Sequence, residues 1–188
     1  MNTLMPRILR LDAGGLPIDW ISLQSAVGHY AQGEVLWEAG RDSFLMRGGI
    51  NAMGVRSVVR VYPIVATASP HRSPQNQTPT LTNAALFARD RYVCLYCGNR
   101  FPAFMLSRDH VIPRAQGGPD AWDNTASACK RCNGLKGART PEQAGMPLIA
   151  LPYTPSTIEA LILRNRNILA DQSDYLSRMV PARDERWQ

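Results

Sequence analysis

The sequence predicts an α+β protein with a small N-terminal α+β domain, a central domain that contains every cysteine, and a C-terminal helix. Three observations favour this organisation: β-branched segments alternate with short amphipathic periods, a proline-rich stretch follows residue 68, and two Cys-x-x-Cys pairs lie in the second half of the chain. We expect a first domain over residues 1–68, an exposed linker over 69–82, a second domain over 83–147 and a helical segment over 148–188.

The N-terminal domain is expected to combine strands with one helix. ILRLDA and LPIDWIS flank Gly14 and Gly15, which predicts a hairpin or a tight bend between two strands. Apolar residues then recur at helical spacing, so a helix is predicted over residues 22–32, ending at Gly33. Residues 56–68 are rich in β-branched side chains and predict a further strand. The role of this domain is open, and recruitment of a protein partner is one hypothesis.

The C-terminal segment predicts one long amphipathic helix. Ser156 and Glu159 match a capping box, and the apolar stripe that follows predicts a helix of about 20 residues ending before Pro181. We expect the stripe to pack against the body of the protein or against a second subunit in a homodimer.

Composition and charge limit the compartment and the partner. No run approaches the roughly 20 apolar residues that span a bilayer, and no signal peptide is evident, so we expect a cytoplasmic protein without a membrane partner. The net charge is +6, and residues 89–139 alone carry nine Lys or Arg and four Asp. A basic segment of this kind favours a polyanionic partner such as nucleic acid, although a solvated basic face is the simpler alternative.

The cysteines predict a structural zinc site. Cys94 and Cys97 form one knuckle, and Cys129 and Cys132 form the other. Four thiolates in this arrangement suit a tetrahedral zinc ion. Disulfides would require an oxidising compartment, and no βαβ pattern supports a redox motif. A four-cysteine site is coordinatively closed, so it would hold the intervening loop in place and would suit a binding module as well as an enzyme.

Between the knuckles, the sequence LSRDHVIPRAQGG places Asp109 and His110 side by side. The segment predicts a short strand stopped by Pro113, and neighbouring side chains in a strand point to opposite faces. One of the two could hold a metal while the other addresses a water molecule. The alternative is a structural pair, with a buried histidine and an ordinary turn aspartate.

In combination, these motifs resemble the HNH endonuclease family, in its subtype with four zinc-binding cysteines. The resemblance covers about residues 87–145 and depends on RDRYVCLYCGNRF, LSRDHVIPRAQGG and WDNTASACKRCNGLKG in this order. It implies a zinc-stabilised ββα-metal nuclease core, in which a β-hairpin and a helix hold one divalent cation. The flanking regions resemble those of bacterial HNH proteins of similar length, which assigns no role to either.

The resemblance also implies roles for individual residues. His110 takes the position of the general base, Asp109 that of a metal ligand, and Asn124 that of the asparagine that braces the hairpin loop. Asn133 stands where the family name has its last histidine, so the chain is an HNN variant. For Asn133 a helix-capping role, and for Asn124 a plain turn role, are the structural alternatives.

The expected chemistry is hydrolysis of phosphodiester bonds in DNA. Because Asp109 and Asn133 offer only oxygen ligands, we expect Mg²⁺ or Mn²⁺ at this site. Free imidazole titrates near pH 6.5, which suits a general base. The runner-up is a non-catalytic zinc module that binds nucleic acid. Six basic residues are candidates for phosphate contacts, the first two being the stronger: Lys136, Arg139, Arg114, Arg108, Lys130 and Arg131.

Overall fold

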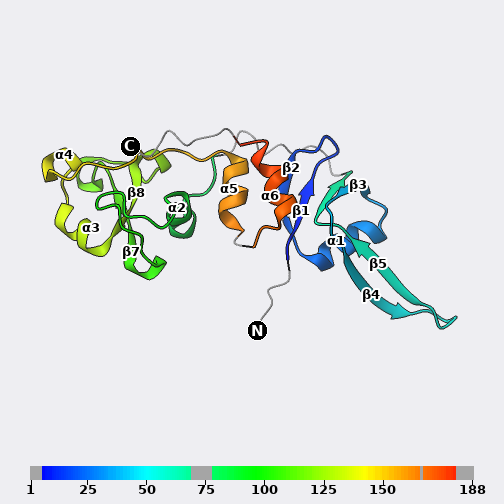
Figure 1. Cartoon of the computed structure of the whole chain (residues 1–188). Coiled ribbons are helices and arrows are strands. Elements are labelled where there is room, and N and C mark those ends of the chain that lie inside the picture. Colours follow the sequence, from blue (N-terminus) through cyan, green and yellow to red (C-terminus); the bar gives the residue numbers. More distant parts are fainter. Residues whose placement is uncertain (1–5, 69–77, 166, 181–188) are drawn as a thin grey trace. The chain divides into compact units, whose positions relative to one another are not determined.

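The computed structural model describes residues 6–68, 78–165 and 167–180 (Figure 1). Its contacts divide the chain into two compact units. The first contains the described residues up to 68 together with those from 165 onward, and the second contains residues 78–164. None of the helices in the described residues is long and apolar enough to cross a membrane.

The N-terminal unit is a four-stranded sheet with helices and a separate hairpin. The sheet has the order β2-β1-β6-β3, from β1 (Ile8–Leu11), β2 (Pro17–Ile21), β3 (Val35–Ala39) and β6 (Ile64–Thr67). β1 pairs with β6 in parallel, and the other pairs are antiparallel. The hairpin consists of β4 (Phe44–Ile50) and β5 (Arg56–Val61).

The structure confirms two predictions for this unit and corrects a third. The bend at Gly14 and Gly15 joins β1 to β2, as expected. The predicted helix is α1 (Leu23–Ala31), and the Ser22 side chain caps it by accepting from the Ser25 amide. The single strand expected over residues 56–68 is wrong, because β5 and β6 are separate strands on either side of Pro63. Proline has no amide proton to continue a ladder.

The C-terminal helix is also different from the prediction. Two short helices, α5 (Thr157–Arg164) and α6 (Ala170–Ser177), replace the single helix, and they belong to different units. The expected capping box at the start of α5 is present, since Ser156 and Glu159 exchange hydrogen bonds. The break follows Arg164, where the Asn165 side chain accepts from the Asn167 amide. Asparagine competes with the helical ladder in this way.

The second unit contains the central domain. It contains α2 (Asn83–Arg89), β7 (Leu106–His110), β8 (Thr125–Cys129), α3 (Lys130–Lys136), α4 (Pro141–Ala144) and α5. Short 3-10 helices η2 (Ala103–Met105), η3 (Arg114–Gln116) and η4 (Trp122–Asn124) lie in its loops. A β-hairpin followed directly by a helix is the expected ββα arrangement, and the predicted α+β fold class is confirmed. Of the predicted linker, residues 69–77 lie outside the described residues.

Candidate functional site

The hairpin that carries the site is tied to its surroundings by one buried arginine. β7 pairs with β8 from Leu106↔Cys129 to His110↔Thr125. Arg89, with a fully buried side chain, donates to the Trp122, Thr125 and Tyr153 carbonyls and pairs with Asp90. Asp90 in turn accepts from the Ser127 amide in β8. These bonds fix α2 against the hairpin and pair the buried charges of Arg89 and Asp90 with each other.

The four cysteines meet in one cluster. The Sγ atoms of Cys94, Cys97, Cys129 and Cys132 all lie within 4.8 Å of one another, which fits four thiolates around a tetrahedral zinc ion. Gly98 allows the first knuckle to turn at φ +74°, and Cys129 caps α3 by accepting from the Cys132 amide. The first knuckle is joined to β8 through Leu95, whose amide donates to Ser127. The predicted zinc site is therefore supported, and its position at the β8–α3 junction anchors the hairpin and the helix together.

Asp109 and His110 project into different surroundings, as strand alternation predicts. Asp109 is buried, and its carboxylate accepts from the Tyr96 hydroxyl and from the Lys136 ammonium, 3.1 Å away. Lys136 also donates to the His110 carbonyl at 2.8 Å. Burial first, and then the Asp109 carboxylate, raise the pKa of Tyr96, so the phenol remains a proton donor.

His110 contacts a residue that the sequence reasoning did not select. Its Nε2 lies 2.9 Å from Oδ1 of Asp120, and Arg108 donates to both oxygens of the same carboxylate at 2.8 Å. The hydrogen bonds from Arg108 are the main cause that lowers the pKa of the Asp120 carboxyl, and the contact with His110 adds to it. The Asp120 side chain is about half exposed. Asp120 is therefore a carboxylate at neutral pH, and an ionised carboxylate only accepts hydrogen bonds.

Asn124 lies where it can hold the loop between β7 and β8. It is buried, its Oδ1 accepts from the Ile112 amide, and its Nδ2 donates to the Ile112 and Pro119 carbonyls. Gly118 passes close to it: a Cβ there would meet the Ile112 carbonyl oxygen at 1.7 Å. These are the bonds expected of a residue that braces the loop. Gly118 leaves the space that the Ile112 backbone and the Asn124 side chain occupy.

Asn133 faces the hairpin from α3. Its Nδ2 donates to Ser107 Oγ at 2.8 Å and to the Arg108 carbonyl at 3.4 Å. One turn further along α3, Lys136 contacts Asp109 and the His110 carbonyl. The described side-chain contacts of Asn133 use Nδ2 only, which leaves the side-chain oxygen Oδ1 available to a cation.

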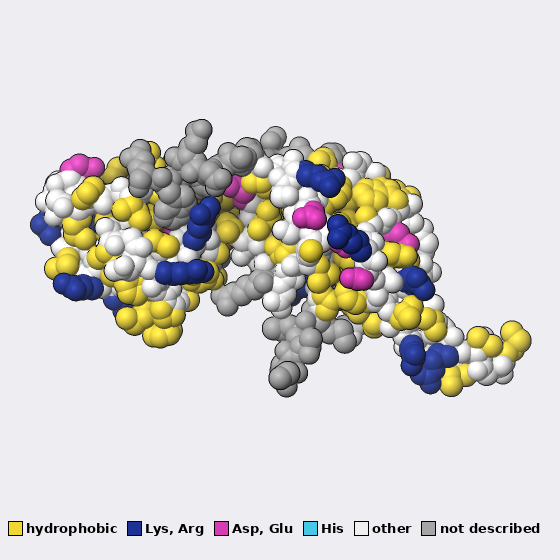
Figure 2. Space-filling view, viewed as in Figure 1, with side chains coloured by type: hydrophobic (Ala, Val, Ile, Leu, Met, Phe, Trp, Pro, Cys, Tyr) yellow, Lys and Arg dark blue, Asp and Glu magenta, His cyan; other side chains and the backbone are white. Residues whose placement is uncertain are grey.

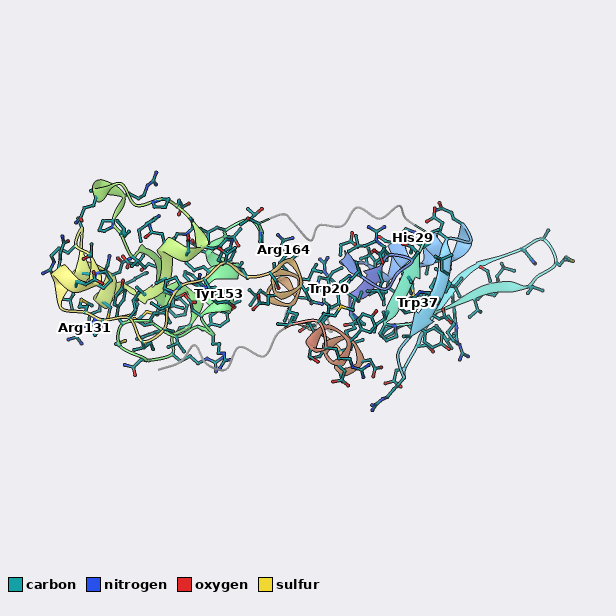
Figure 3. The ribbon with its side chains drawn as sticks, turned by 90° about the horizontal axis from the view of Figure 1, so that it is seen from above. Trp20, His29, Trp37, Arg131, Tyr153 and Arg164 are labelled. Atoms are coloured by element: carbon teal, nitrogen blue, oxygen red, sulfur yellow. The ribbon has the colours of Figure 1, made fainter. Side chains whose placement is uncertain are left out.

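The basic candidates fall into three groups. Lys136 was expected to reach a phosphate, and this is wrong: the side chain is fully buried in its ion pair with Asp109. Arg108 and Arg139 are engaged within the unit, Arg108 with Asp120 and Arg139 with the last carbonyls of α3. The remaining three are exposed: Arg114, Lys130 and Arg131. Lys130 and Arg131 line a groove beside the second knuckle, and Figure 3 shows Arg131 at the outer edge of its unit.

The fit of a catalytic divalent cation depends on Asp109. Oxygen donors from Asp109 and Asn133 suit Mg²⁺ or Mn²⁺ chemically. However, each oxygen of Asp109 already accepts one hydrogen bond, and one of the donors is an ammonium ion. A cation held by Asp109 would share this carboxylate with Lys136, because each carboxylate oxygen has a second lone pair. The residues fit an oxygen-liganded cation with that ammonium beside it.

Three further residues contribute to the site but were not predicted as site residues from the sequence: Asp120, Tyr96 and Arg89. The sequence does contain a signal for Asp120, since it is an acidic residue that follows Gly117 and Gly118 in the same loop. Tyr96 and Arg89 had none, because their partners are distant in sequence and an aromatic or basic residue alone predicts no buried contact.

Comparison with known proteins agrees with the predicted resemblance. Residues 94–149 match the family model described as HNH endonuclease. The crystal structure of the Type II-C Cas9 enzyme from Actinomyces naeslundii is similar at 21% identity and a TM-score of 0.29, covering 55% of this chain and 11% of that one. The comparison with curated proteins found no match. The family match supports a nuclease activity in general terms.

Proposed function

We propose that this HNH domain hydrolyses phosphodiester bonds in DNA, with His110 as the general base and one divalent cation held by Asp109 and Asn133. The observation that carries the proposal is the chain of contacts from Arg108 through Asp120 to His110, on a hairpin fastened to the four-cysteine cluster. A histidine that acts as a general base needs a fixed imidazole ring and one defined tautomer, and this chain of contacts would favour both.

The contact with Asp120 supports Nδ1 as the imidazole nitrogen that would act as the base. Because Asp120 can only accept, the proton of neutral His110 lies on Nε2, which donates to Oδ1. The lone pair is then on Nδ1, the nitrogen that would take a proton from the attacking water. Arg108 keeps Asp120 ionised and in place, so it acts through Asp120 as a positioning residue.

The divalent cation would supply Lewis-acid stabilisation of the phosphate oxygens and the leaving group. Asp109 would hold it through its carboxylate, and Asn133 through the amide oxygen that the hairpin contacts leave unused. Mg²⁺ or Mn²⁺ suits this ligand set better than a metal that prefers nitrogen.

One observation favours the second candidate, a non-catalytic zinc module that binds nucleic acid. Asp109 is buried and neutralised by Lys136, which is the arrangement expected of a structural ion pair. In that case the exposed Lys130, Arg131 and Arg114 would still contact phosphates, but no water would be activated.

A plasmid-nicking assay separates the two functions. Purified zinc-loaded protein is incubated with supercoiled DNA with and without added Mg²⁺ or Mn²⁺, and the nicked form is measured over time. We expect nicking that requires the added cation. DNA binding without nicking under every divalent cation tested would reject the enzyme and leave the binding module.

A further inference from the structure

The β4–β5 hairpin of the N-terminal unit forms an exposed arm. Its two strands pair only with each other among the described residues. Every residue from 47 to 58 is exposed, and Figures 1 and 3 show this ribbon extending beyond the other elements of its unit. An isolated two-stranded hairpin is marginally stable in water, so a solvent-exposed arm of this length requires a structural reason.

The arm is ordered at both ends. At its base, Phe44, Met46 and Val59 pack against the core cluster that contains Val61. At its tip, the Asn51 side chain accepts from the Met53 and Val55 amides. The chain thus holds the ribbon in a defined shape before any partner binds, which lowers the entropic cost of binding.

One face of the arm is basic. Leu45 pairs with Arg60 and Arg47 pairs with Val58, so the two arginines lie on the same face, since side chains alternate along a strand. Arg56 is two residues before Val58 and shares that face. The opposite face carries the residues that pack on the core.

Within the described part of the chain, no acidic side chain compensates the charge of this face. Residues 43–68 contain no Asp or Glu. Among the described residues, no carboxylate forms an ion pair with Arg47, Arg56 or Arg60. Beyond them, the end of the arm exposes large apolar side chains, with Met53 85% exposed and Ile50 and Val55 each 60%. Figure 2 shows basic side chains along the arm and apolar ones at its end.

We propose that this arm binds duplex DNA, with the three arginines on the phosphates and the apolar tip in a groove. Three positive charges without a carboxylate complement a polyanion. A two-stranded ribbon fits the major groove, and apolar side chains contact the thymine methyl group or wedge between base pairs. The inference rests on the proposed function for its choice of DNA, and it assigns the N-terminal unit to substrate binding.

The test measures binding separately from cleavage. Fluorescence anisotropy of a short labelled duplex is recorded with the full chain, without added divalent cation, over a series of salt concentrations. The arm variant is R47Q/R56Q/R60Q, and the control R7Q/R164Q/R178Q removes the same charge from exposed arginines elsewhere. Circular dichroism checks that both are folded.

We expect the arm variant to raise Kd by roughly 10–100-fold near 0.1 M salt and to reduce the salt slope by about 0.9 per arginine. The control should change both much less. M53S should weaken binding without changing the slope, because it removes no charge; an unchanged Kd for M53S would exclude the tip from the contact.

Equal losses in the arm variant and the control, or unchanged binding in the arm variant, would overturn the proposal. A loss of binding to anionic phospholipid vesicles with unchanged DNA binding would overturn it in favour of a membrane surface. If the wild type binds DNA through the arm but never nicks it, the proposed nuclease function is rejected and the proposal that the arm binds DNA is retained. If it nicks DNA and the arm variant binds as the wild type does, only the arm proposal fails.

Discussion

Two adjacent residues of β7 have different surroundings, and the difference comes from the alternation of side chains along a strand. Asp109 lies in a buried network with Tyr96 and Lys136, while His110 contacts the half-exposed Asp120. Alternation could be predicted from the sequence. The burial of Lys136 could not, because helical spacing gives the direction of a side chain around the helix and not the depth of packing above it.

Asp120→Asn tests the positioning of the base. An amide both donates and accepts, so it no longer holds the proton of His110 on Nε2. We expect long-range ¹H–¹⁵N spectra to show the Nε2–H tautomer in the wild type and a mixture in the variant, together with a fall in nicking rate of about 10-fold or more, a fraction of the full general-base contribution. An unchanged tautomer with an unchanged rate would remove Asp120 from the mechanism.

Lys136→Met tests the buried ion pair. The substitution leaves the Asp109 carboxylate buried without its cation, so we expect a loss of about 3–5 kcal/mol in the free energy of unfolding, measured by urea denaturation. The matched control is the double variant D109N/K136M, which removes both charges and should recover part of this loss.

The same variant reports on the cation. Because the Lys136 ammonium and the proposed divalent cation would share the Asp109 carboxylate, Mg²⁺ should raise the Tm of Lys136→Met more than that of the wild type. Stability of Lys136→Met equal to that of the wild type would contradict the ion pair, and identical responses to Mg²⁺ would contradict Asp109 as a ligand.

At the scale of elements, the hairpin, the helix and the zinc cluster depend on one another. Cys129 ends β8 and caps α3. In the first knuckle, Leu95 follows Cys94 and its amide donates a hydrogen bond to the Ser127 carbonyl in β8. The cysteine spacing predicted the zinc site, because metal-ligand geometry is local and specific. The resemblance to the HNH family implied the hairpin and helix. The sequence did not predict two helices at the C-terminus, because the apolar pattern continues across Asn165 although the helical backbone ends at Arg164.

Removal of zinc should therefore unfold the hairpin and α3 together. We expect about one zinc ion per chain in the purified protein, and its release by a chelator to abolish nicking even when Mg²⁺ is restored without zinc. The matched variants are Cys132→Ser, which removes a ligand, and Ser127→Ala, which lies in β8 but binds no metal. Full structure by circular dichroism after zinc release would show that the sulfur cluster does not stabilise the core.

At the scale of the whole molecule, the chain joins a nuclease-type unit to a unit that carries a basic arm. The sequence predicted a small N-terminal α+β domain and located the nuclease motifs in the domain that follows, but it did not predict the β4–β5 hairpin. Its first strand, β4, contains Gly48 and Gly49, where the pairing register shifts, and such a bulge hides the alternation of a strand. Residues 56–68 were assigned to one strand for a related reason, since β-branched residues on both sides of Pro63 conceal the break.

In the proposed mechanism, His110 activates water beside an oxygen-liganded cation, on a scaffold held by four sulfurs. The single-turnover rate of plasmid nicking by the zinc-loaded wild type and by His110→Ala, in Mg²⁺, Mn²⁺ and Ni²⁺, tests this mechanism. We predict nicking by the wild type in Mg²⁺ or Mn²⁺, and a loss of at least about 10²-fold in His110→Ala with zinc content and fold retained. Full activity of His110→Ala, or nicking that requires Ni²⁺ and fails in the other two, would contradict the account.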